Sequence, residues 1–383
     1  MRKFTLIFAS LLAFVGVAKA QEASTDVYAT TPGVEVQLST TGGEQYVYYV
    51  RDITSSATGD VFLKAPSTSN DEFARFTSSS SEAMRVVFEG TSASSVGAYV
   101  VDADGTKTHK WRSGGAMWLW LLSKPDTRTG SDCNTSLEKQ TDEVNGAVYK
   151  IRGSSRSGKY FFKADNGGSA VRNDQAKAGD NWQFIPANDA AKEAAGWPKV
   201  TVLAGDATHG NLTTFSSTKP VVCPDDYQVF TATYADNTLS LEEVADRVIP
   251  ANTGVIVKGA KGSFFMVPNA TENTLTSALI ATGAEGKTVA EGETIFGLGL
   301  QDATLGFYKV KESTTIGAGK AYFQATGSEG SAISLSFGGA TTGIHAATIA
   351  AESNAPVFDL SGRRVQKAVK GGIYIQNGKK FVK

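Results

Sequence analysis

Short runs of alternating apolar and polar residues, separated by Gly, Ser and Thr, occupy most of the chain, and sustained apolar repeats at helical spacing are hard to find. This pattern is typical of β-strands joined by turns. Eight such runs lie in the second half, at 199–203, 227–234, 238–242, 254–258, 263–267, 306–311, 320–324 and 331–337. We therefore expect an all-β protein, with a β-sandwich domain in residues 199–340.

A seven-residue pattern recurs in the first half: a Gly, a variable residue, three mostly apolar residues, a polar residue and an Ala. It occurs at 59–65, 97–103 and 158–164. Similar strands precede the first and third copies, and an aromatic closure follows each copy, at 71–76, 117–120 and 180–184. Three copies of strand, turn, strand and closure are what a β-trefoil needs. We predict a β-trefoil-like domain in residues 21–187, with the register of the unevenly spaced copies left open.

The strand at 158–162 and the closure at 180–184 resemble the ricin-type trefoil lectins, whose repeats close on a Gln-x-Trp motif. The resemblance covers residues 45–187. Asn181 and Trp182 take the place of the motif's end without its Gln, and Phe161 and Phe162 stand where the sugar-binding lectins place an Asp. The resemblance implies a trefoil fold for this part of the chain.

The first twenty residues follow the pattern of a cleavable signal peptide. Arg2 and Lys3 supply positive charge, residues 6–17 are apolar, and residues 18–20 offer small side chains to a peptidase. The apolar stretch is short for a membrane span, and no later segment reaches the needed length. We expect a mature chain from Gln21, no transmembrane anchor, and a location outside the cell or on its outer surface.

Two linkers are expected at 188–198, which is Ala-rich, and at 341–356, which is of low complexity.

Residues 248–259 and 298–322 resemble a β domain of large exported proteins from bacteria that use type IX secretion. The tail 357–383 resembles the end of their C-terminal sorting domains, which implies export machinery as its partner. The residues that carry this match are Gly362, Arg363, Gly372, Tyr374, Asn377 and Gly378.

From its residues alone, the tail 357–383 predicts about three strands joined by tight turns, with Asn377 and Gly378 suited to a type I′ hairpin. So few strands are not stable alone, so we expect them to join a partner sheet or to fold transiently for recognition. A solvated basic hairpin is the alternative.

The charge balance and the absence of known motifs limit the classes of function that the sequence allows. Lys and Arg number 37 against 38 Asp and Glu, so no global field would attract nucleic acid. The three histidines lie far apart, and no metal-binding, nucleophile-elbow or phosphate-loop motif is present. We expect a protein that is not an enzyme and needs no cofactor. A carboxylate pair brought together only by folding stays open.

Cys133 and Cys223 are the two cysteines. If the chain is exported into an oxidising compartment, the two can form a disulfide. The alternative hypothesis is that each is a small buried residue without a disulfide.

Sugars stack their C–H faces on aromatic rings, and Asp or Asn side chains bind their hydroxyls. We expect Trp118, Trp120 and Trp182 in the core, and Trp111, which lies between two cations, as the most exposed ring. The candidate glycan-binding residues are Trp111, Tyr160, Asp165, Asn166, Asn173 and Asp174.

The sequence thus predicts a non-catalytic, lectin-like surface protein that binds a glycan or surface polysaccharide through its N-terminal domain. The first alternative is a surface adhesin or structural protein that binds host or matrix protein. The second is a glycoside hydrolase with an unrecognised carboxylate pair.

Overall fold

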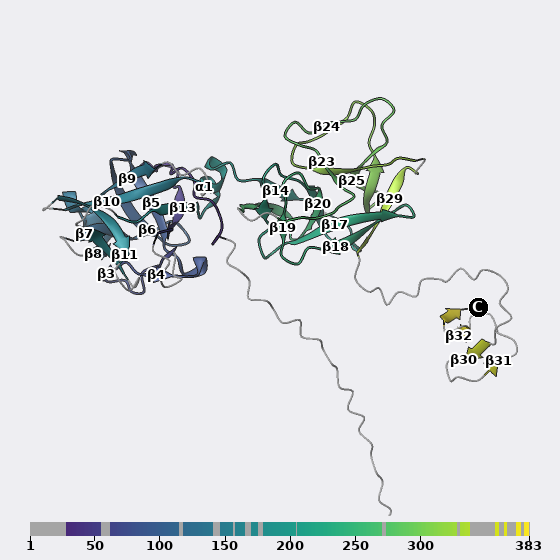
Figure 1. Ribbon diagram of the computed structural model, residues 1–383, viewed down its shortest axis with the longest axis horizontal. Coiled ribbons are helices and arrows are strands. Elements are labelled where there is room, and N and C mark those ends of the chain that lie inside the picture. Colours follow the sequence, from purple (N-terminus) through teal and green to yellow (C-terminus); the bar gives the residue numbers. More distant parts are fainter. Residues whose placement is uncertain are drawn as a thin grey trace, which may run out of the picture.

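The computed structural model (Figure 1) confirms the all-β prediction, because strands make up nearly all of its regular structure. It describes residues 28–54, 62–114, 118–140, 146–155, 158–164, 170–174, 179–203, 205–269, 273–327, 330–337, 357–359, 364–365, 373–376 and 379–382. Strands β1 to β13 gather in one body and β14 to β29 in another. No helix in these ranges is long and apolar enough to cross a membrane.

The described residues of the N-terminal unit, which spans 28–187, contain thirteen strands and three short 3₁₀ helices. The strands are β1 (Val47–Asp52), β2 (Phe62–Leu63), β3 (Glu72–Phe73), β4 (Phe76–Thr77), β5 (Arg85–Ser92), β6 (Ser95–Val101), β7 (Lys107–Gly114), β8 (Trp118–Ser123), β9 (Asn134–Gln140), β10 (Val148–Ser155), β11 (Gly158–Ala164), β12 (Val171–Asp174) and β13 (Trp182–Pro186). The 3₁₀ helices are η2 (Ser80–Glu82), η3 (Pro125–Thr127) and η4 (Ser131–Cys133).

Six strands of this unit pair in a closed antiparallel ring, in the order β1, β5, β6, β9, β10, β13 and back to β1. Six of the remaining seven strands form the pairs β2–β4, β7–β8 and β11–β12. Strand β8 also pairs with β3 and β12, which joins the hairpins to one another. A closed ring leaves none of its six strands as a free edge.

The three copies of the seven-residue pattern, whose register the sequence left open, do not occupy equivalent strands. The seven-residue pattern at 59–65 overlaps β2 and the copy at 158–164 is β11, both hairpin strands, but the copy at 97–103 falls on the ring strand β6. The closures at 71–76 and 180–184 also fall on unlike strands. Ring and hairpin strands both contain largely buried runs, for example β13 of the ring and β2 of a hairpin, so a local apolar pattern does not distinguish them.

Aromatic rings fill the interior of the ring. Phe184 on β13 lies edge-on to Tyr48, Phe88 and Tyr149, with centroids 6.2, 5.1 and 5.0 Å away. All four side chains are at most 4% exposed. Edge-to-face pairs of this kind stabilise a core beyond the area they bury.

An N-terminal segment, residues 28–39, crosses this unit without regular structure. Arg51 holds it, because its Nη1 donates to the carbonyls of Tyr28 and Ala29 at 2.7 and 2.6 Å, and its Nη2 donates to that of Thr31 at 2.6 Å. The same guanidinium donates to the Gln183 side chain on β13. This buried cation therefore fastens the segment to the ring.

The expected linker, residues 188–198, contains a short helix. Helix α1 (Asp189–Ala194) starts at Asn188, whose side chain accepts from Ala191 N and Val47 N, each at 3.1 Å. Trp197 beyond it is 5% exposed and packs with Phe62 and Ile185 of the N-terminal unit and with residues of the second unit. The segment that was expected as a linker thus takes part in a shared apolar cluster.

The second unit, residues 199–337, contains a nine-stranded sheet in the order β15-β20-β17-β18-β29-β26-β25-β28-β23, whose pairs are antiparallel except for the parallel pair β18–β29. All eight strand runs predicted here are confirmed. The strands are β14 (Lys199–Val202), β15 (Leu212–Phe215), β16 (Val221–Val222), β17 (Gln228–Ala235), β18 (Thr238–Glu243), β19 (Val248–Ile249), β20 (Val255–Lys258), β21 (Gly262–Phe265), β22 (Val267–Pro268), β23 (Ile280–Ala281), β24 (Lys287–Thr288), β25 (Ile295–Gln301), β26 (Thr304–Lys309), β27 (Thr315–Ile316), β28 (Ala321–Gln324) and β29 (Ala332–Phe337).

Both faces of this sheet are buried near β20. Ile256 packs with Phe230, Phe296 and other residues of the nine-stranded sheet, whereas Val255 and Val257 pack with residues of β14, β16 and β19. A strand covered on both faces reads as a continuous apolar run, as this one does.

The tail forms a four-stranded antiparallel arrangement, β31-β30-β32-β33, instead of about three strands. Its strands are β30 (Val357–Asp359), β31 (Arg364–Val365), β32 (Ile373–Gln376) and β33 (Lys379–Val382). Tyr374 lies on β32 opposite Phe381, and Gln376 opposite Lys379. Outside the described residues lie Gly362, Arg363, Gly372, Asn377 and Gly378.

Candidate functional site

The structure brings three of the sequence-predicted site residues to one hairpin. Tyr160 lies on β11 opposite Gly153, while Asn173 and Asp174 lie on β12 opposite Phe162 and Phe161. Asp165 and Asn166, in the connection between these strands, lie outside the described residues. Trp111 is not part of this group.

The expectation that Trp111 is exposed was wrong. It is 1% exposed and packs in the core with its centroid 5.8 Å from that of Phe88 and 6.1 Å from that of Phe162. Its neighbours Lys110 and Arg112 are partly exposed, as alternation along β7 requires. In a strand, two flanking cations point outward and thereby turn the residue between them inward.

Trp118 and Trp120 lie on one face of β8, as their spacing predicts, but this face is the outer one. Leu119 and Leu121 are at most 1% exposed, whereas both tryptophans are half-buried. The expectation that these two rings lie in the core was therefore wrong. The same expectation for Trp182 is confirmed, because this residue is 1% exposed. Since Trp and Leu are both apolar, the sequence alone does not say which of the two sets points inward.

Phe73 completes a cluster with these tryptophans. It lies opposite Trp120 across the β3–β8 pair, with its ring centroid 4.1 Å from that of Trp120 and 5.6 Å from that of Trp118. We call Phe73, Trp118 and Trp120 the outer aromatic patch. Three half-buried rings in contact on the solvent side of a sheet form a surface on which a ligand ring could stack.

The loop before β3 is fastened to β8, which holds Phe73 over Trp120. Asp71 accepts from Ser123 N at 2.8 Å and from its hydroxyl at 2.7 Å, and Arg128 donates to the same carboxylate at 3.2 Å. One residue earlier, the Asn70 carbonyl lies 3.1 Å from Nε2 of the buried His109. The patch is thus assembled by side chains that do not belong to it.

We expect acid to loosen this attachment. Hydrogen bonds from Ser123, followed by the charge of Arg128, lower the pKa of Asp71 from its usual 3.8. Because the folded-state pKa is lowered, this interaction stabilises the folded chain above pH 3.8 and is lost as the pH falls through the folded pKa. A titration from about pH 5 to about pH 2 should shift the tryptophan emission to the red.

The Asp71→Asn variant is the control for this titration, since its side chain does not ionise. Its emission should lack the acid transition assigned to this carboxylate. Since Asp71 is partly exposed, the accompanying change in the free energy of unfolding should be below about 1 kcal/mol. An identical titration curve in the variant would contradict the assignment.

A charged pair borders the outer aromatic patch. Arg112 lies on β7 opposite Trp120, and its Nε donates to Asp132 of η4 at 2.7 Å. Gly130 precedes η4 with φ 143°, and a Cβ there would lie 2.7 Å from the Asp132 carboxylate. A glycine at this position therefore leaves room for the acid that orients Arg112.

The disulfide between Cys133 and Cys223 is not present. Both are buried free thiols, and Cys223 packs among residues of the second unit while Cys133 ends η4 in the N-terminal unit. Burial raises the pKa of Cys133 and raises that of Cys223 to about 12. The second reading, two buried small residues, holds.

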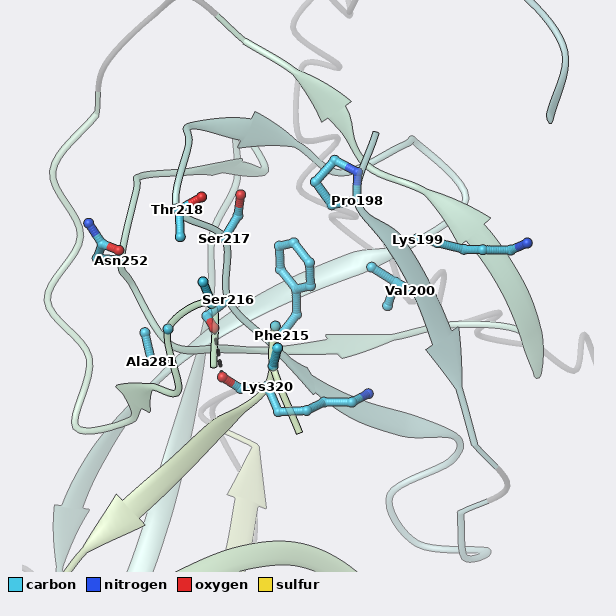
Figure 2. Close-up of a pocket in the computed structure, with 14 residues that line it drawn as sticks. Pro198, Lys199, Val200, Phe215, Ser216, Ser217, Thr218, Asn252, Ala281 and Lys320 are labelled. Atoms are coloured by element: carbon cyan, nitrogen blue, oxygen red, sulfur yellow. Dashed lines mark hydrogen bonds between the residues drawn. The ribbon is translucent and has the colours of Figure 1, made fainter. Parts of the chain in front are cut away.

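A cavity of about 320 Å³ lies in the second unit, beside Phe215 and Val200 (Figure 2). The side chains of Lys320 and Asn252 point away from each other, and the Ser216 hydroxyl donates to the Lys320 carbonyl at 2.6 Å. Burial lowers the pKa of Lys320, whose Nζ donates to Thr213. The polar groups that line the cavity do not converge on one point. The cavity is therefore a weaker candidate for a binding site than the outer aromatic patch.

Among the residues that the structure describes, no three or more His, Cys, Asp or Glu side chains gather to hold a metal ion.

The sequence placed both tryptophans of the patch on one face of a strand but assigned that face to the core, and it indicated neither Phe73 nor the Arg112–Asp132 pair. Phe73 lies in the aromatic closure at 71–76 that follows the first copy of the repeat. The sequence could therefore have indicated it as a candidate residue. The ion pair joins residues twenty positions apart through η4, and no local pattern indicates it.

No protein-family model matches the chain, and a search of curated proteins finds no relative.

Proposed function

We propose that this chain is a non-catalytic, exported surface protein that binds glycans through the outer aromatic patch of its N-terminal unit. The contact of Phe73, Trp118 and Trp120 on the solvent side of β3 and β8 carries the proposal. Half-buried rings keep a rigid position and present a face to solvent, which suits the apolar C–H face of a sugar. The Arg112–Asp132 pair beside them offers polar groups for hydroxyls.

We further infer that the N-terminal unit is a β-trefoil. A six-stranded ring with three hairpins, repeated as four strands at a time along the chain, supports this inference. The resemblance to ricin-type lectins agrees with it, but the patch lies on β3 and β8, away from the β11–β12 hairpin where the candidate Tyr160, Asn173 and Asp174 lie.

Export is part of the proposal. The N-terminal signal peptide would take the chain across the inner membrane, and the tail 357–383 would engage a type IX export machinery. Four short antiparallel strands with a two-residue connection between Gln376 and Lys379 are compatible with a recognition tail of this kind.

The test is a broad glycan screen of the full mature chain, followed by affinity measurement on the strongest glycan. Trp120→Ala should weaken binding at least about tenfold, which corresponds to about 1.4 kcal/mol. The matched control is Phe264→Ala, which removes a half-buried ring from a stacked pair with Tyr227 in the second unit and should leave binding unchanged.

A screen with no glycan response would overturn the proposal, and specific capture of host or matrix protein in its place would support the adhesin. Equal losses in the two variants would place the glycan elsewhere on the chain.

A further inference from the structure

The guanidinium of Arg112 has unused donors beside the outer aromatic patch. Only its Nε is engaged, with Asp132, and its terminal nitrogens donate to no atom of the described residues. The side chain is 42% exposed, while Asp132 is 17% exposed. The carboxylate therefore fixes the orientation of the fork and leaves its outer nitrogens to solvent. Such a fork binds a carboxylate through two parallel hydrogen bonds.

A second cation on the same face has no acidic partner. Lys110 lies two residues before Arg112 on β7, so the two are about 7 Å apart along the strand. Its Nζ donates to the Arg128 carbonyl at 3.0 Å and lies 5.0 Å from the centre of the Tyr99 ring. No acid in the described part of the chain lies within ion-pair distance of it. Its charge is therefore available to an anion.

Three cations lie close together beside the patch. Lys110, Arg112 and Arg128 gather near Cys133, where their charges lower the pKa of its thiol against the effect of burial. Arg112 and Arg128 are paired with the acids Asp132 and Asp71. Of the three cations, Lys110 is the one without an ion-pair partner among the described residues.

We propose that the glycan bound at the outer aromatic patch is acidic, and that Arg112 binds the carboxylate of a uronic acid while Trp120 stacks on a sugar ring. This inference rests on the proposed function and specifies its ligand class. Arg112 and Trp120 are directly opposed across β7 and β8, so a sugar ring and its carboxylate reach both side chains at once.

The experiment compares two polymers that differ only in charge. Full mature chain is titrated with polygalacturonate and with the same polymer after complete methyl esterification. We expect at least about tenfold tighter binding of the acid form, and sodium chloride raised from about 0.05 M to about 0.5 M should remove most of this preference. Dextran sulfate serves as the third arm, and binding weaker than that of polygalacturonate supports a carboxylate over other anions.

Variants assign the preference to one side chain. Arg112→Gln should lower the affinity for polygalacturonate to that for its ester, and Arg112→Lys should restore only part of the difference because an ammonium lacks the fork. Lys309→Gln is the matched control, since it removes one exposed cation from β26 in the second unit. Urea unfolding of each variant checks that the fold is intact.

The outcomes separate this inference from the proposed function. Equal binding of the two polymers, tighter binding of dextran sulfate, or a preference that survives in Arg112→Gln would overturn the assignment of an acidic glycan and leave glycan binding intact. Silence of both polymers, together with silence across the glycan screen, would overturn both.

Discussion

Replacing Arg51 by Met is expected to lower the free energy of unfolding by about 3 kcal/mol and to release residues 28–39 from the ring. Arg51 is 6% exposed, and its guanidinium donates to three backbone carbonyls and to Gln183. Methionine keeps much of the apolar stem but leaves these buried acceptors without their donor. Each such loss costs about 1–3 kcal/mol. Urea unfolding, followed by tryptophan emission, measures the change.

The Arg51→Lys variant separates charge from geometry. A lysine keeps the positive charge but has no planar fork to span Tyr28 and Thr31, so we expect it to recover less than half of the lost stability. Limited proteolysis should then cut near Tyr28 faster in both variants. Unchanged stability of Arg51→Met would show that the segment is held by other contacts.

Replacing Trp111 by Ala is expected to cost about 3–5 kcal/mol of stability, the range for a large buried aromatic side chain. The indole is 1% exposed and contacts Phe88 and Phe162. Its Nε1 has no hydrogen-bond partner among the described residues, so packing alone accounts for the loss. Thermal unfolding should show a lower melting temperature, and Trp111→Phe should show a smaller decrease.

The same variant tests the position of the binding site. If the outer aromatic patch binds the glycan, the folded fraction of Trp111→Ala keeps its affinity, and only the amount of active protein falls. Titration with the glycan at low temperature, where the variant is folded, distinguishes fewer binding sites from weaker ones. A fully folded Trp111→Ala variant that has lost its affinity for the glycan would show that Trp111 takes part in binding.

The sequence allowed the strands to be predicted well because alternation reports burial directly. It predicted the eight runs of the second unit and the shared face of Trp118 and Trp120. It did not tell the inner face of β8 from the outer one, because Trp and Leu are both apolar. That choice depends on β3, β7 and β12, which reach β8 from other parts of the chain.

Trp111 shows a different limit. The sequence places it between two cations, which suggested a solvent-facing ring, but the alternation of β7 reverses that inference. The Arg112–Asp132 pair and the attachment of Asp71 to Ser123 join segments that are distant in sequence. Contacts of this kind depend on the folded arrangement, and no spacing of residues in the sequence predicts them.

The parallel pair β18–β29 has a consequence for how the chain is made. Residue 238 pairs with residue 334, so β18 has no neighbour on that side until the ribosome has added the strands between them. Contacts between such distant segments form late in folding, since a long loop must first close. A nascent chain that stops short of β29 cannot complete this sheet, so the last neighbour of β18 arrives only after nearly a hundred further residues have been synthesised.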